Sequence, residues 1–172
     1  NIESSKKSIE LARNYSFVYA AVGVHPHDAS ECDKNTIETL KALSEADKVV
    51  AIGEIGLDYH YDFSPKEVQR EWFARQIALA RELKLPIIIH DRESHKDILD
   101  IIKSEKGNEV GGVFHCFSGS KEIAQEVLDL GFKIGLGGAI TFKNAKRPIE
   151  VLNYVPLDML LVETDCPYMT PE

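Results

Sequence analysis

Histidines and carboxylates follow five short apolar runs of this chain. They are His25, Glu54, His90, His115, and the pair Glu163 and Asp165. Short apolar runs bounded by turn residues are typical of buried parallel strands. The carboxyl ends of such strands meet at one edge of a sheet, where α/β proteins build metal and catalytic sites. We therefore expect these side chains to form a single site.

The donor types in this set predict a divalent metal ion. Histidine nitrogens and carboxylate oxygens without thiolates suit Zn²⁺, Mn²⁺ or Mg²⁺. Glu54 has two oxygens that can bridge two ions, and Asp165 can bind metal and accept a proton from water. As an alternative, Glu54 pairs with Arg75 or Arg92 and binds no metal. The sequence has no phosphate-binding GxxxxGK[ST] loop and no dinucleotide fingerprint, so the metal hypothesis predicts metal-assisted hydrolysis.

Weaker signals surround these positions. A His25-Pro26-His27 segment is a weak metal motif by itself, and we expect His27 to contact substrate. The planar guanidinium of Arg92 either binds an anionic substrate group or pairs with an acid such as Glu93. Glu163 shares a strand face with the aspartate two positions later, as a supporting acid or a structural partner.

Helix-like segments alternate with the strand-like runs. Apolar spacing predicts a helix around Asn35–Ala46. Ser64–Glu67 has the pattern of an N-cap, a first-turn proline and a capping-box glutamate. Ser94 begins another helix, and Ser118 or Ser120 caps the next. Strands are expected at 17–24, 49–52, 87–89, 112–114, 132–138 and 159–162. Because nearly every strand ends on a polar residue, we favour a barrel over an open doubly wound sheet.

The composition fits one α/β domain over residues 1–172. The chain is 44% hydrophobic and 28% charged, as in ordinary globular proteins, and no apolar run approaches the roughly 18 residues of a membrane span. Three cysteines without paired spacing fit a reducing cytoplasm. A net charge of −8 does not favour tight binding of duplex DNA, but it allows a nucleic-acid substrate held through metal ions and local cations.

Five segments together resemble the TatD family of metal-dependent deoxyribonucleases, which belongs to the amidohydrolase-like barrels. They are GVHPH at 23–27, GEIGLDY at 53–59, IHDR at 89–92, HCFSG at 115–119 and ETDCPY at 163–168. The resemblance implies a (β/α)₈ TIM barrel and DNA as substrate. The residues that it assigns to one or two divalent ions are Glu54, His90, His115 and Asp165. His25 lies beside the same site, and we take Glu54, Asp165 and His25 as the catalytic residues.

The chain departs from the family pattern at both ends. A first strand ending in a His-x-His pair does not precede Asn1, and the segment that follows ETDCPY in the family is absent. We count six of the eight strands and expect open edges at Phe17–Val24 and Leu160–Val162.

Three functions are consistent with these residues. The leading hypothesis is end-trimming hydrolysis of DNA phosphodiester bonds. A second is hydrolysis of an amide, a lactone or a small phosphoester in the same barrel. A third is an inactive, truncated module that binds metal or a partner.

Overall fold

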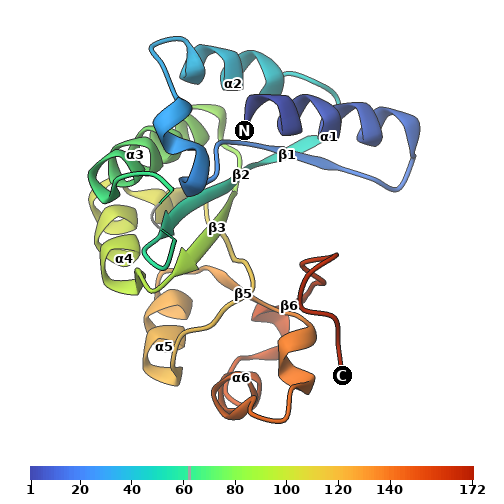
Figure 1. Cartoon of the computed structure of the whole chain (residues 1–172), viewed down its shortest axis with the longest axis vertical. Helices are drawn as coiled ribbons and strands as arrows, with labels where there is room; N and C mark the ends of the chain where they lie inside the picture. Colours follow the sequence, from blue (N-terminus) through green and yellow to red (C-terminus); the bar gives the residue numbers. More distant parts are fainter. Residues whose placement is uncertain (62) are drawn as a thin grey trace.

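The computed structural model describes residues 1–61 and 63–172 as six parallel strands with helices between them (Figure 1). The strands are β1 (Ala20–Val22), β2 (Val49–Asp58), β3 (Ile87–Arg92), β4 (Gly112–Phe114), β5 (Lys133–Leu136) and β6 (Leu160–Val162). The α-helices are α1 (Ile2–Asn14), α2 (Thr36–Ser44), α3 (Lys66–Leu83), α4 (His95–Ser104), α5 (Lys121–Asp129) and α6 (Lys146–Leu152). Short 3₁₀ helices cover Pro26–Glu31, Gly107–Glu109, Gly138–Thr141 and Leu157–Met159.

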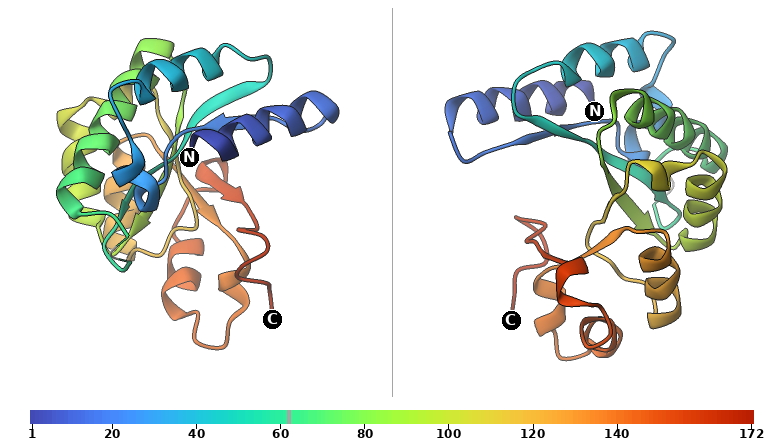
Figure 2. Two further views of the ribbon diagram at one scale, coloured as in Figure 1. Left: turned by 45° about the horizontal axis from the view of Figure 1, so that its top comes forward. Right: turned by 180° about the vertical axis from the view of Figure 1, so that it is seen from behind.

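The six strands lie side by side in chain order, β1-β2-β3-β4-β5-β6, and every neighbouring pair is parallel. A doubly wound sheet reverses its strand order at a switch point, whereas a barrel does not. The sheet curves, with α3, α4 and α5 along its outer side and the segment after β6 across from them (Figure 2). The predicted barrel-type α/β fold, with six strands, is therefore confirmed.

The core lies between the strands and the outer helices. Side chains in β2, β3 and the helices against them are fully buried, including Ile52, Ile55, Leu57, Ile77, Ile87, Ile89 and Ile98. In α3 the buried positions recur every three or four residues, so one face of this helix packs on the sheet. None of the described helices is both long and apolar enough to cross a membrane.

Several predicted boundaries were wrong. Strand β1 is shorter than 17–24, and Phe17 is 80% exposed. Strand β2 is longer than 49–52 and continues to Asp58, so Glu54 lies within a strand rather than after one. The residue that caps α3 is Pro65, and the Ser64 hydroxyl bonds elsewhere. Ser120, not Ser118, caps α5 by accepting from the backbone N–H of Ile123.

The two outer strands of the sheet are β1 and β6 (Figure 1). Val162 of β6 is 90% exposed, and Leu161 is 41% exposed. In β1 the side chains of Ala20 and Val22 are buried. The two strands expected at the edges are therefore the outer ones, and apolar side chains are exposed in β6 and, on the other side, at Phe17 and Tyr19 just before β1.

Candidate metal centre

Glu54 is positioned by a close approach between β2 and β3. A Cβ atom on Gly53 would lie 2.6 Å from Cβ of Ile88, and one on Gly56 would lie 2.0 Å from the carbonyl oxygen of His90. Glycine is needed at Gly56 for a second reason, its φ of +144°. Both glycines lie within β2 rather than in a turn. They let the strands approach, and Glu54 Oε1 lies 3.0 Å from Nδ1 of His90.

Three histidines gather on one side of Glu54. His25 and His27 follow β1 at the start of a 3₁₀ helix, and their ring centroids are 4.3 Å apart. The ring of His90 lies 4.4 Å from that of His25. One ring nitrogen from each of the three lies within 4.8 Å of the other two. Among the described residues, this is the one group of three or more potential metal ligands that lie so close together. His27, which we expected to contact substrate, therefore belongs to this cluster.

Asp58 connects the histidines to each other and to the following segment. Its side chain is fully buried, and its Oδ2 lies 2.8 Å from Nε2 of His27 and 3.0 Å from Nε2 of His90. Its Oδ1 accepts from the backbone N–H groups of His60 and Tyr61 at 3.0 and 2.9 Å. The sequence analysis missed this residue. Its signal was the period of two along an extended β2, which places it on the same face as Glu54.

Two buried glutamines of α3 fix the backbone beside the site. Gln76 accepts from the N–H of Val24 at 2.7 Å and donates to its carbonyl at 3.0 Å, directly before His25. Gln69 forms the same pair of bonds with the backbone of Asp58, at 2.8 and 3.0 Å. Because the N–H and the carbonyl of Val24 and of Asp58 are both hydrogen-bonded, the backbone that presents His25 and Asp58 is held in place.

The protonation of these groups suits a cation. Burial and the nearby His90 lower the pKa of His25 to about 3, so its ring is neutral. Burial alone would raise the pKa of Asp58, but hydrogen bonds from Tyr61 and the two histidines lower it to about 2. Burial likewise opposes ionisation of Glu54, and its bond to His90 overcomes that effect, so the pKa of Glu54 is lowered.

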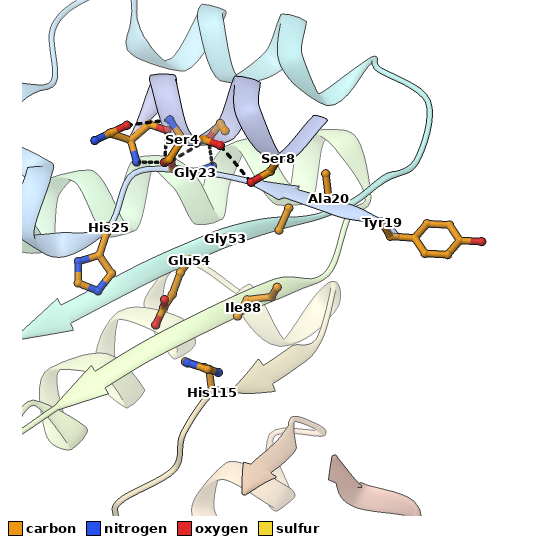
Figure 3. Close-up of a pocket in the computed structure, with 13 residues that line it drawn as sticks. Ser4, Ser8, Tyr19, Ala20, Gly23, His25, Gly53, Glu54, Ile88 and His115 are labelled. Atoms are coloured by element: carbon orange, nitrogen blue, oxygen red, sulfur yellow. Dashed lines mark hydrogen bonds between the residues drawn. The ribbon is translucent and has the colours of Figure 1, made fainter. Parts of the chain in front are cut away.

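A second group of side chains lies on the other side of Glu54. His115 follows β4, and its Nε2 lies 3.3 Å from Oδ1 of Asp165, which follows β6. Its Nδ1 contacts Glu163, which is thus the deeper partner that the strand alternation predicted. His25, Glu54 and His115 line one pocket of about 440 Å³, and Figure 3 shows the glutamate between the two histidines.

The arginines do not pair with Glu54 in the described part of the chain. The Arg92 guanidinium lies 4.7 Å over the ring of Tyr61, and Arg75 pairs with Glu71. Glu93, the expected alternative partner of Arg92, bonds instead to a histidine between β2 and α3. Both of the non-metal explanations that we gave for Glu54 and Arg92 are therefore wrong, and the partner of Glu54 is His90.

The donor set fits divalent metal ions. The four residues expected as ligands form two contacting pairs, Glu54 with His90 and His115 with Asp165. All donors are imidazole nitrogens or carboxylate oxygens, as Zn²⁺, Mn²⁺ and Mg²⁺ prefer. Both ring nitrogens of His90 face carboxylates, Nδ1 toward Glu54 and Nε2 toward Asp58. If His90 held a metal through one nitrogen, the carboxylate at the other would orient the ring.

The model of the family described as TatD related DNase matches residues 1–172. The chain belongs to this family. It is 51% identical over 165 residues to the uncharacterized metal-dependent hydrolase YabD of Bacillus subtilis, covering 96% of this chain and 65% of YabD. It is 36% identical over 172 residues to the 3'-5' ssDNA/RNA exonuclease TatD of Citrobacter koseri, covering 99% of this chain and 66% of that protein.

A solved structure with the same arrangement is that of YJJV, a TatD homologue from Escherichia coli K12. It superposes with a TM-score of 0.92 at 37% identity, covering 99% of this chain and 66% of YJJV. A Saccharomyces cerevisiae amidohydrolase at 23% identity, with a TM-score of 0.82, shares the fold. The chain spans 57 to 65% of the length of the hydrolases YcfH and YabD. The expected TatD family and its barrel-type fold are thus confirmed.

Proposed function

We propose that this protein is a metal-dependent hydrolase that trims DNA by cleaving phosphodiester bonds at its ends. One observation carries the proposal: an ionised Glu54 lies between the histidine cluster of His25 and His90 and the pair formed by His115 and Asp165. A carboxylate with further nitrogen and oxygen donors on both sides would suit a pair of divalent ions, and such a pair would stabilise the attacking and leaving oxygens of the reaction. The similarity to a protein named as a 3'-5' ssDNA/RNA exonuclease supports nucleic acid as the substrate class.

Four residues would hold the ions, namely Glu54, His90, His115 and Asp165. Ions bound there would polarise a phosphoryl oxygen and supply a nucleophilic water at neutral pH. His25 stays neutral and lines the same pocket. Asp165 is about one-third exposed, which leaves it free to accept a proton while His115 holds its orientation. His27 and Arg92 both lie against the ring of Tyr61, and we assign them to contacts with the substrate.

The proposal is tested by a substrate panel on the full-length protein. The protein is stripped with a chelator and then supplied with Mg²⁺, Mn²⁺ or Zn²⁺. We expect a 5'-labelled single-stranded oligonucleotide to be shortened stepwise in the presence of metal, and to stay intact with chelator. Hydrolysis of an aryl ester or a lactone without shortening of the oligonucleotide would establish the alternative hydrolase instead. Metal binding without any hydrolysis would favour the non-enzymatic module.

Glu54→Gln tests the role of the central carboxylate. The substitution keeps the shape and removes the charge between the two clusters, so we expect hydrolysis to fall about a thousandfold or more. Glu71→Gln is the matched control, since Glu71 pairs with Arg75 on the outer face of α3. Near-normal turnover of a folded, metal-replete Glu54→Gln protein would exclude the role given to Glu54.

A further inference from the structure

Two exposed aromatic rings stack on each other beside the metal centre. Tyr61 and Phe63 lie between β2 and α3, with ring centroids 5.4 Å apart and ring planes inclined by 18°. Tyr61 is 41% exposed and Phe63 is 64% exposed. Large aromatic side chains contribute to stability through burial, which Phe63 largely lacks and Tyr61 has only in part. Their exposure therefore points to a ligand rather than to the core.

Hydrogen bonds hold this aromatic pair in place from both sides. The backbone N–H of Tyr61 donates to Asp58 at 2.9 Å. Directly after Phe63, the hydroxyl of Ser64 donates to the carbonyl of His27 at 2.8 Å, and the carbonyl of Ser64 accepts from Gln69 at 2.8 Å. The rings are thus presented by a segment whose anchors are also the supports of the histidine cluster. Such preorganisation lowers the entropy lost on binding.

The ring of His27 lies between the pair of Tyr61 and Phe63 and the proposed metal ligand His90. The edge of His27 meets Phe63 at 4.8 Å and Tyr61 at 5.6 Å between centroids. The same His27 ring lies 6.0 Å from that of His90. The Arg92 guanidinium lies over one face of Tyr61, so a cation adjoins the aromatic pair. Flat π surfaces, a cation and a site for phosphate chemistry therefore occupy adjacent positions.

We propose that Tyr61 and Phe63 form a stacking platform for an unpaired nucleobase of the strand being cleaved, with Arg92 on the adjoining phosphate. This inference rests on the proposed function, and it assigns a base-binding surface for single-stranded substrates of the kind named for the Citrobacter koseri relative. A nucleobase inside a duplex has no free face to stack on a side chain, whereas every base of a single strand does. A net charge of −8 gives little overall attraction for phosphates, whereas stacking of a base on an exposed ring does not depend on net charge or on sequence.

Binding without cleavage tests the platform. Single-stranded oligonucleotides, intact or with one abasic site at each of the last three 3' positions, are titrated against the full-length protein in chelator. We expect one abasic position to weaken binding by about 5- to 150-fold, the effect of one stacked base. In the variant Tyr61→Ala with Phe63→Ala, intact and abasic strands should bind equally weakly.

Two further variants make the test specific. Tyr15→Ala with Phe17→Ala removes another exposed aromatic pair, with centroids 6.0 Å apart, which lies before β1 and so at the opposite end of the sheet. It should bind like the unmodified protein. Tyr61→Phe with Phe63→Tyr keeps both rings and should retain the preference for the intact strand, which shows that ring loss and not misfolding causes the defect.

The inference is overturned if the double alanine variant binds the intact strand as tightly as the unmodified protein, or still discriminates against the abasic strand. Its failure is separable from failure of the proposed function. A protein that shortens DNA with metal, but is unaffected by loss of the rings, retains the function without the platform. A protein that discriminates the abasic strand in chelator, but cuts nothing with metal, retains the platform without the function.

Discussion

Asp58→Asn is expected to destabilise the metal-free protein by about 3 kcal/mol at pH 7. The carboxylate accepts four hydrogen bonds, two from histidine rings and two from backbone N–H groups. An asparagine oxygen can keep the two backbone bonds, but its amide donates toward the rings. A hydrogen bond to a charged group contributes about 1.5–3 kcal/mol. Two such bonds are lost, and a change of histidine tautomer offsets part of the loss.

The pKa of Asp58 gives an independent estimate of the same stabilisation. Its pKa falls from 3.8 to about 2 on folding, and this difference of roughly 1.8 corresponds to ~2.5 kcal/mol. Because the folded pKa is the lower one, the stabilisation is complete above the unfolded pKa and disappears as the pH falls through about 2. The difference between the two proteins should therefore shrink progressively below about pH 4.

Urea denaturation in chelator measures both effects. The free energy of unfolding is compared between the two proteins at pH 7 and again near pH 3. Asp100→Asn is the control, since that carboxylate is exposed and pairs with Lys96 on one face of α4. It should change stability by less than about 0.5 kcal/mol. The reasoning is refuted if Asp58→Asn behaves like this control, or if its effect is the same at both pH values.

Three other perturbations have definite outcomes. Gly56→Ala should destabilise the fold by at least ~3 kcal/mol in thermal or urea unfolding, since its Cβ would lie 2.0 Å from a carbonyl oxygen. Gly131 also has a positive φ, +81°, but a Cβ there would meet nothing within 4 Å, so Gly131→Ala should cost only about 1–2 kcal/mol. Gln76→Ala should cost about 2–3 kcal/mol, since it leaves the N–H and carbonyl of Val24 unpaired in the interior, and an unchanged midpoint would contradict that role. The hydrogen bond between His95 and the Asp91 carboxylate raises the pKa of His95. This bond therefore stabilises the folded protein fully below about pH 6.5, and its contribution is lost as the pH rises through the folded pKa of His95. In His95→Gln, the free energy of unfolding measured between pH 6 and 9 should no longer show this decline.

The sheet could be predicted from the sequence because each strand has its own apolar run. The runs that end before His25, His90 and His115 are bounded by polar residues, so their order and parallel direction followed directly. The length of β2 could not be predicted in the same way. A glutamate normally ends an apolar run, and the close approach of strands that lets Glu54 sit inside β2 depends on which glycine faces which neighbour.

The supports of the site were the hardest part to predict. Asp58 is a single acidic residue whose partners come from β3 and from the segment after β1. Ser64 had the pattern of a helix cap, but its hydroxyl is used to hold the carbonyl of His27. The inner-face position of Gln76 follows from helical spacing, whereas its bond to Val24 is a contact across 52 residues that no local pattern encodes.

The most direct test of the central claim is anomalous diffraction from crystals of the full-length protein loaded with Zn²⁺. We expect one or two strong peaks within about 2.0–2.2 Å of Glu54 oxygens, with His90, His115 and Asp165 completing the ligands. Peaks that lie away from Glu54 in a protein that cleaves DNA with Zn²⁺ would contradict the proposed metal centre. So would fully occupied ions held by the three clustered histidines alone, with Glu54 still bonded to His90.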